Sequence, residues 1–423
     1  MQAQSVTLFQ PLRHQRFRQL WFANAAANLG TWTQTCAAAW TLASLTDSAL
    51  AVALMPSAMY APLFLFSLAA GLAADSFHRG RLLLIMSGVR MTAAAAMAFA
   101  VLAGYADATI VLLLTFALGC GTAFSLPAWQ AATSTLVAPE EIGAAARLNN
   151  LSYNLSALLG PWLAGMLIEP LGAAPLFLAN ALSLSAMLWT CWRWSRASDE
   201  DHARPAGPTQ PAADAPHRSS FSWAAFRLGI HSAWQARAYR RLLIQSGAIF
   251  FASVSYTALL PLFVRDTLHM DGSAYGMLMG AMGAGAVLSA LLTGRLRAWL
   301  PAAWLLAGAL ALFGAVLILL PLLRLWPLPL LAALAAGLAW SLIVTTLNGQ
   351  AQSAFPEALR ARTLSVYILA VAGAQAAGAA FWGMLHERLS LSLGIGLAVA
   401  LPCAGAMLLA CAIFSFHLNI KEL

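Results

Sequence analysis

Long apolar stretches alternate with short polar connections along almost the whole chain. A membrane-spanning helix needs about 20 mostly apolar residues, and the chain offers stretches of that length in two sets of six. We expect spans near residues 19–44, 48–74, 82–104, 108–130, 147–168, 172–193, 242–264, 273–294, 301–322, 328–349, 364–385 and 391–416. The pattern predicts an all-α integral membrane protein with twelve transmembrane helices.

One long polar stretch divides the two sets of spans. Its first part, up to Ser220, is rich in Pro, Ala and charged residues, and its second part alternates aromatic residues with arginines. We predict a six-helix bundle at residues 1–195, a cytoplasmic linker at 196–240 and a second six-helix bundle at 241–423. The aromatic and basic part of the linker favours an amphipathic helix on the membrane surface, with a plain solvated linker as the alternative.

Composition supports a membrane protein. Hydrophobic residues make up 61% of the chain and charged residues 9%, whereas a soluble domain carries about 25% charged residues. The net charge of +8 would suggest nucleic-acid binding in a soluble protein. Here the basic residues lie in short loops between spans, so we expect contact with a lipid bilayer and none with nucleic acid.

The distribution of basic residues predicts the orientation in the membrane. With the N-terminus inside, 19 of the 23 Lys and Arg residues fall on the cytoplasmic side and three outside, while Arg90 falls within a span. Cytoplasmic loops carry such an excess in membrane proteins. We therefore predict a multi-pass protein of a bacterial inner membrane with both termini in the cytoplasm.

The two halves of the chain also resemble each other. Pro139-Glu140 precedes a span that ends in Gly165-Met-Leu, and Pro356-Glu357 precedes one that ends in Gly383-Met-Leu. The offset is 217 residues at the Pro-Glu pair and 218 at the glycines. An internal repeat of half the chain is typical of secondary transporters.

The connection after the second span has a specific pattern. It reads GLAADSFHRGR and contains Gly71, Asp75, Arg79, Gly80 and Arg81. A carboxylate beside guanidinium groups at the seam between two bundles can hold one conformation closed and release it in another. Ordinary positive-inside loop charge is the alternative. At this place in the chain the pattern resembles the loop signature of the major facilitator superfamily.

The fifth span provides a second resemblance. Asn154 is followed by Gly160, Pro161 and Gly165, and such a helix is bent and packs closely on a neighbour. A similar element is typical of the superfamily's drug-exporting antiporters. A packing helix with no influence on the direction of transport is the alternative.

Three longer segments resemble the branch that contains enterobactin exporters and related drug–proton antiporters. They are FRQLWFANAAANLGTW, LVAPEEIGAAARLN and LPLFVRDTLHMDGSAYG, from the first span, residues 136–149 and residues 260–276. The resemblance covers both halves and excludes the linker. It implies two pseudo-symmetric six-helix bundles, a central cavity and export by alternating access.

The chain departs from these relatives in its charged residues. Many relatives have an acidic residue after the glycine of the first span, where Gly30 is followed here by Thr31. No carboxylate lies at mid-membrane, so proton coupling would have to use Asp75 or an acid at a loop edge. Arg90 is the one deep charge. It can bind an anionic substrate, support the loop around Asp75 or extend to the cytoplasmic face, and support of the loop is favoured.

Polar and aromatic residues near mid-span are candidates for a substrate cavity, because amides in hydrocarbon need polar partners. Hydrogen bonds between helices are the competing explanation. The candidates are Asn24, Asn28, Trp32, Gln34, Gln130, Asn150, Asn154, Tyr256, Met279, Trp340, Asn348, Tyr367 and Gln375.

These observations favour a secondary exporter of a small amphipathic molecule, coupled to proton antiport. A siderophore is the specific substrate hypothesis, and an outer-membrane efflux protein is a further expected partner. A broad multidrug exporter is the nearest alternative, and a transporter-like sensor or assembly protein without flux belongs to a different class. We find no catalytic constellation or metal-ligand spacing, so we expect neither an enzyme nor a cofactor.

Overall fold

The computed structural model describes residues 7–77, 79–203, 231, 234–355, 357–393 and 396–420. This part of the chain is helical and contains no strand. The first six long helices are α1 (Gln15–Leu45), α2 (Ala49–Ser76), α3 (Arg79–Leu102), α4 (Ala108–Thr135), α5 (Ile142–Leu171) and α6 (Ala173–Ala203). The next six are α8 (Arg237–Leu262), α9 (Gly272–Trp299), α10 (Ala302–Leu319), α11 (Leu328–Ser353), α12 (Glu357–Leu393) and α13 (Gly396–Ile420).

The chain also has four short helical segments. Three are 3-10 turns, η1 (Gln10–Arg13), η2 (Pro139–Glu141) and η4 (Leu320–Leu322), and the fourth is the π-helical segment η3 (Phe263–Thr267) at the end of α8. The segment η1 precedes α1, and the other three lie between consecutive long helices.

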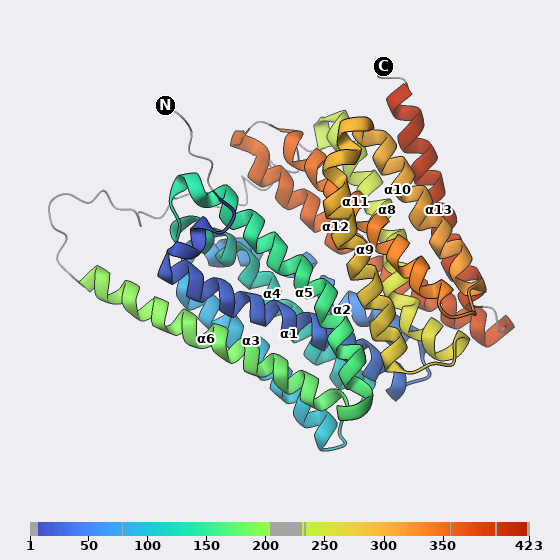
Figure 1. Cartoon of the computed structure of the whole chain (residues 1–423), viewed down its shortest axis with the longest axis horizontal. Coiled ribbons are helices and arrows are strands. Elements are labelled where there is room, and N and C mark those ends of the chain that lie inside the picture. The colour runs from blue at the N-terminus through green and yellow to red at the C-terminus, as the bar shows by residue number, and fades with distance from the viewer. Residues whose placement is uncertain are drawn as a thin grey trace.

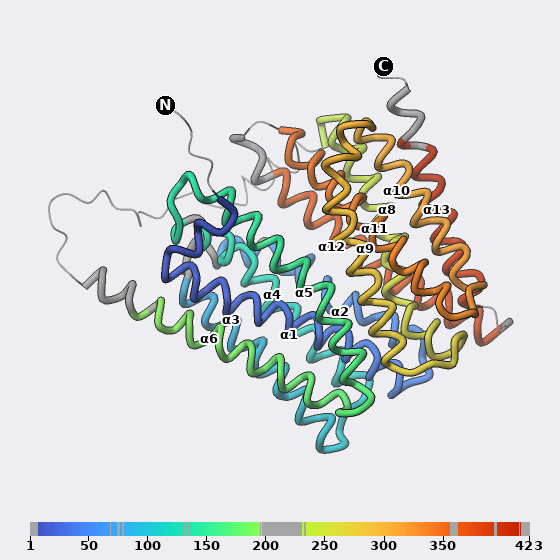
Figure 2. The backbone as a smooth tube through the Cα atoms, in the orientation of Figure 1, coloured from blue at the N-terminus to red at the C-terminus, as the bar shows by residue number. Residues whose placement is uncertain are grey.

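The helices form two bundles, α1–α6 and α8–α13 (Figure 1). The colour gradient of Figure 2 shows that each bundle is built from one half of the chain. We call the end where α1 begins and α13 finishes the near end, and the opposite end the far end. The bundles converge at the far end and diverge toward the near end (Figure 1). Contacts between bundles come mainly from α2 with α12 and α5 with α9.

Helix ends at the far end are capped by local side chains. Ser48 accepts a hydrogen bond from the Ala51 backbone N–H, and Asp107 accepts one from the Ile110 N–H. Asp271 accepts from the N–H groups of Ser273 and Ala274. These caps satisfy orphan donors of the first turn, which matters where hydrocarbon offers no other partner.

Eleven of the helical segments are long and apolar enough to cross a membrane. The remaining long helix, α1, has 31 residues, which exceeds the length that a span requires. Its amides, threonines and arginines lower its hydropathy. The predicted architecture of two six-helix bundles is confirmed.

The helices next to the linker differ from the predicted boundaries. The helix α6 continues past residue 195 to Ala203, and α8 begins at Arg237, before residue 241. Arg193 and Arg196 lie over the rings of Trp189 and Trp192, one turn earlier, and such pairs four residues apart stabilise a helix. Most of the predicted surface helix, at 221–230 and 232–233, lies outside the described residues.

Candidate functional site

Three charged side chains join the two bundles at the far end. Glu387 of α12 accepts hydrogen bonds from the Leu50 N–H, at 2.8 Å, and from the Ser48 hydroxyl, at 3.1 and 3.2 Å. Glu169 of α5 accepts one from the Gly272 N–H at 3.0 Å. Arg265 of the second bundle donates to the carbonyl oxygens of Ala43 and Thr46 at the end of α1.

Each of these charges meets a helix end of the opposite bundle with the favourable sign. Glu387 lies at the N-terminus of α2, and Glu169 lies at the N-terminus of α9. Arg265 lies at the C-terminus of α1. A helix N-terminus carries partial positive charge and its C-terminus partial negative charge, so each contact gains from the helix dipole. The three charges therefore hold the far end closed.

The sequence repeat explains the placement of the two carboxylates. The same 218-residue offset that relates the paired glycines also separates Glu169 from Glu387. Glu169 lies near the far end of α5 and caps α9, and Glu387 lies near the far end of α12 and caps α2. Each glutamate therefore caps the second helix of the opposite bundle. Two equivalent seams therefore join the bundles, α5 against α9 and α12 against α2.

The seam between α5 and α9 brings two backbones into direct contact. A methyl group at Gly165 would lie 2.7 Å from the Gly276 Cα, and one at Gly276 would meet the Gly165 backbone. Farther along, a methyl group at Gly280 would lie 3.2 Å from Trp162, and one at Gly283 would lie 2.6 Å from the Leu158 Cα. Glycine is required here because no side chain fits between the helices.

The seam between α2 and α12 uses side chains as well as glycine. Gly383 faces the Ala53 methyl group, and a methyl group at Gly373 would lie 2.8 Å from the Phe64 ring. The Ser57 hydroxyl donates to the Ala376 carbonyl at 2.6 Å. This seam therefore combines close packing with a hydrogen bond between the bundles.

The predicted cavity residues Asn150 and Asn154 lie where α5 parts from α9. Residues four apart share one face of a helix, so Asn154 and Asn150 continue the line of Leu158 toward the near end. Leu158 still meets α9 at Gly283, whereas both asparagines are exposed. The part of α5 where the bundles diverge thus carries two exposed amides, and their contact with a substrate stays a prediction.

Aromatic side chains border this polar line. Trp32 of α1 and Tyr153 of α5 make an edge-to-face contact with ring centroids 5.7 Å apart. A methyl group at Gly160 would lie 2.5 Å from the Trp32 Cβ, so the glycine fixes the position of the tryptophan. Tyr153 is 52% exposed. Amides beside aromatic rings can bind a molecule that has both apolar and polar parts.

Sequence reasoning included Trp32, Asn150 and Asn154 in the cavity but missed Tyr153. The signal in the sequence is its position directly before Asn154, in a span that also carries Asn150.

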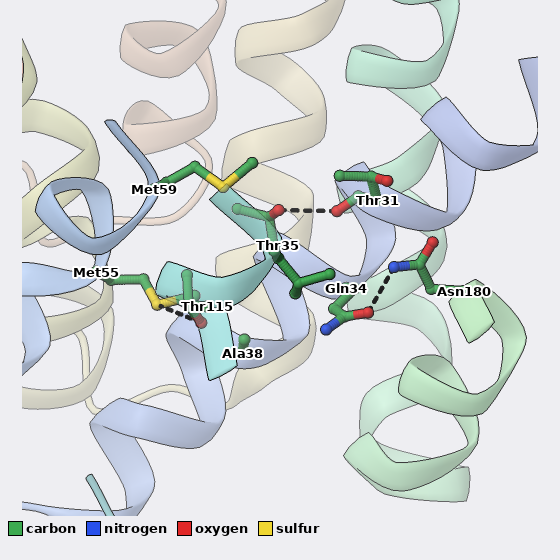
Figure 3. A pocket seen from close by; sticks show the side chains of 9 residues that line it. Thr31, Gln34, Thr35, Ala38, Met55, Met59, Thr115 and Asn180 are labelled. Atoms are coloured by element: carbon green, nitrogen blue, oxygen red, sulfur yellow. Dashed lines mark hydrogen bonds between the residues drawn. The ribbon is translucent and has the colours of Figure 1, made fainter. Parts of the chain in front are cut away.

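Gln34 has a different environment, inside the first bundle. Its side-chain oxygen accepts a hydrogen bond of 2.5 Å from the Asn180 amide of α6. Both residues line a cavity of about 10 Å³ among α1, α2, α4 and α6 (Figure 3), together with Thr31, Met55 and other side chains. A volume of this size holds about one water molecule. The Gln34 contact is thus a hydrogen bond between helices.

The aromatic candidates of the second bundle lie in its packed interior. Tyr256 is fully buried with its ring centroid 5.9 Å from that of Phe313. Trp340 lies between Phe250 and Phe313, at 5.2 and 6.1 Å. These rings form an aromatic cluster that joins α8, α10 and α11.

The other cavity candidates range from buried to exposed. Tyr367 and Gln375 of α12 are buried, and Gln130 of α4 is exposed. Four are half-buried: Asn24, Asn28, Met279 and Asn348. Their contact with a substrate stays a prediction.

Comparison with known proteins agrees with this geometry. A family model described as transmembrane secretion effector matches residues 6–423. The chain belongs to this family. It is 24% identical over 398 residues to the multidrug efflux pump Tap of Mycobacterium tuberculosis, with 91% of this chain and 90% of that one covered. The Tap protein of Mycobacterium bovis matches equally.

Solved transporters share the fold. The nucleoside transporter NupG is 12% identical with a TM-score of 0.73, covering 95% of this chain and 99% of that one. An inward-facing, occupied bacterial homologue of the human lysosomal transporter Spinster is 15% identical with a TM-score of 0.68, covering 96% of each chain. The predicted membership of the major facilitator superfamily is confirmed.

The superfamily's loop signature lies at the near end of the first bundle. Gly71 is half-buried in α2, Gly80 is buried in the first turn of α3, and Arg81 is exposed. Asp75 lies in the last turn of α2 and Arg79 begins α3. The side chains of Asp75 and Arg79 lie outside the described residues, so the predicted switch stays a prediction.

Arg90 extends from α3 to α1. Its guanidinium donates to the Thr31 hydroxyl at 2.7 Å, and its stem passes over Gly121 of α4, where a methyl group would collide with it. The Arg90 Nε is buried without a hydrogen-bond partner among the described residues. The contact with Thr31 therefore points into the first bundle.

Proposed function

We propose that this chain exports small amphipathic molecules across a bacterial inner membrane by alternating access. The observation that carries the proposal is the asymmetry between the two ends of the molecule. Charged caps and glycine contacts close the far end, while the α5 line of Asn150 and Asn154 is uncovered toward the near end. The excess of basic residues on near-end loops supports a cytoplasmic location for that end, and with this orientation the proposed state is inward-open.

Export rather than uptake is supported by the comparisons. The family is described as secretion effectors, and the relative in Mycobacterium tuberculosis is named a multidrug efflux pump. That name favours a broad range of substrates. The resemblance of three segments to enterobactin exporters favours a siderophore. A surface of amides and aromatic rings beside Trp32 suits either class.

Proton antiport is part of the proposal. In the described residues, carboxylates occur near helix ends and not at mid-span. Asp75 and the acids at the far end are therefore the candidates for the proton site. Rocking of the two bundles about the seams would alternate access between the two faces.

Transport in inverted membrane vesicles tests this function. With an acidic lumen, we expect vesicles that contain the protein to accumulate ethidium or a catecholate siderophore, and accumulation to collapse with the gradient. The double variant Asn150→Ala/Asn154→Ala should lower uptake about 30-fold, because each amide contributes about 1 kcal/mol of hydrogen bonding. Gln352→Ala removes another exposed amide on α11 and should leave uptake unchanged.

Further readouts separate the alternatives. Deletion that changes drug resistance supports multidrug efflux, and deletion that abolishes secreted siderophore supports the specific exporter. Saturable ligand binding without accumulation of any tested substrate would contradict export and support a sensor or assembly protein.

A further inference from the structure

A second cavity lies at the near end of the first bundle, on elements other than the seams. It has a volume of about 220 Å³ and is bordered by the start of α1, the end of α4 and the last part of α6. Its polar lining consists of Gln15, Arg16, Gln19, Thr190, Arg193 and Trp194. The proposed transport function leaves this cavity without a role.

The lining is rich in hydrogen-bond donors. It has two guanidinium groups, two amides and one indole, and the described residues that line it include no Asp or Glu. The Thr190 hydroxyl donates to the Ala186 carbonyl of its own helix. Guanidinium groups bind phosphate oxygens through paired N–H donors. Pockets for drug-sized ligands have about 300–1,000 Å³, so a cavity of 220 Å³ fits a smaller phosphate-bearing group.

The surroundings place the cavity at the level of lipid headgroups. On α6, exposed Trp189 and Trp192 lie beneath the guanidinium groups of Arg193 and Arg196, at 4.9 and 4.3 Å. Tryptophan and arginine side chains gather where a helix leaves the hydrocarbon. The positive-inside count assigns this end to the cytoplasmic leaflet, where anionic lipids attract basic side chains.

We propose that this cavity binds the phosphodiester headgroup of an anionic phospholipid from the cytoplasmic leaflet. Arg16 of α1 and Arg193 of α6 contact the phosphate from two helices, and the amides of Gln15 and Gln19 contact the glycerol. The bound headgroup links α1 to α6 at the near end. The proposal depends on the membrane orientation and not on export, so failure of transport in vesicles would leave it standing.

Native mass spectrometry of the full-length protein tests the proposal. Purified protein is titrated with short-chain phosphatidylglycerol, and the most tightly retained lipid is quantified. We expect Arg16→Gln/Arg193→Gln to weaken its binding roughly 30-fold, because each basic group contributes to binding an anionic lipid. Arg16→Lys/Arg193→Lys keeps both positive charges and should lose less of the affinity for the lipid, because only the paired N–H donors of the guanidinium groups are removed.

The matched control is Arg18→Gln/Arg196→Gln, which removes two arginines from the same helices outside the cavity lining. This control variant should weaken binding of the most tightly retained lipid by about threefold or less. Equal losses in both double variants would refute a specific site, as would equally tight binding of phosphatidylcholine. Displacement of the lipid by millimolar inorganic phosphate would identify a free-phosphate site and overturn the lipid proposal. Circular dichroism of each variant checks that the helices remain folded.

Discussion

The two seams between the bundles occupy equivalent places in the repeat but are built differently. The α5–α9 seam presses glycine backbone against glycine backbone, at Gly165 and Gly276. The α2–α12 seam places Gly373 against the Phe64 ring and adds the Ser57 hydroxyl bond. Their carboxylates differ too, since Glu387 accepts from two groups and Glu169 from one.

If the bundles rock as proposed, this difference predicts a division of labour between the two seams. Direct backbone contact tolerates little change in the distance between the two helices, because no side chain at the contact can move to fill a gap. A flexible ring and a polar bond can be remade over a range of positions. We infer that the α5–α9 seam acts as the tighter pivot and that the α2–α12 seam adjusts around it.

The largest expected effect comes from Gly276→Ala. Its added methyl group meets the Gly165 backbone, so the two helices must separate, at a cost of about 3 kcal/mol. At Gly373→Ala the methyl group meets a ring that can turn, so the cost is smaller. The far end should therefore open about 100-fold more often in the first variant than in the wild type.

Labelling of Cys36 measures this opening. The thiol is buried beside the Pro161 carbonyl, one turn from Trp40, whose ring stacks on Tyr275 across the seam. With the other four cysteines replaced by serine, a membrane-impermeant maleimide added outside labels Cys36 when the far end opens. Equal labelling of the two glycine variants would contradict the proposed difference.

The next effect comes from the carboxylates. Glu387→Gln removes a charge that accepts hydrogen bonds from Leu50 and Ser48 at the α2 N-terminus, and hydrogen bonds to a charged group contribute about 1.5–3 kcal/mol. Glu169→Gln removes a single charged contact to α9 and should cost less. We expect Cys36 labelling to rise about 30-fold in the first variant and about fivefold in the second. The reverse order would show that the α5–α9 carboxylate dominates closure.

A smaller effect is expected for Ser57→Ala. The variant removes the hydrogen bond from the Ser57 hydroxyl to the Ala376 carbonyl, and a neutral hydrogen bond contributes about 1 kcal/mol. Cys36 labelling should rise about fivefold. Ser57→Thr keeps a hydroxyl and serves as the control. Unchanged labelling in Ser57→Ala would mean that this bond does not contribute to closure.

The smallest effect concerns the caps of α9 and α2. Hydrogen bonds from the Ser273 hydroxyl and backbone N–H groups lower the pKa of Asp271 below its usual range, so its stabilisation is present at neutral pH and is lost as acid protonates it. The equivalent cap of α2 is Ser48, which does not titrate. Acid below the usual carboxyl range should therefore weaken α9 more than α2.

Asp271→Asn keeps a capping side chain and should remove this pH dependence with a loss of a few tenths of a kcal/mol, whereas Asp271→Ala should cost about 1 kcal/mol at neutral pH. Hydrogen exchange of the first turns of α2 and α9 at two pH values measures the pH dependence and the loss of stability. Identical acid sensitivity in wild type and Asp271→Asn would assign the effect to another group.

The sequence predicted some site residues better than others for a physical reason. Asn150, Asn154 and Trp32 were identified because polar and aromatic groups in a span need a partner. The same reasoning selected Gln34, Tyr256 and Trp340, which the fold places inside single bundles. Polarity says that a side chain has a partner, but not whether that partner is a substrate or another helix.

The sequence by itself determined the membrane architecture, the orientation expected from basic loops and the repeat of half the chain. These follow from composition, local periodicity and spacing, which a linear chain carries directly. Only the tertiary structure decided that Glu169 and Glu387 cap helices across the seams, that Gly165 meets Gly276, and that Arg90 contacts Thr31. Such contacts join residues tens to hundreds of positions apart, and their partners depend on how the bundles pack.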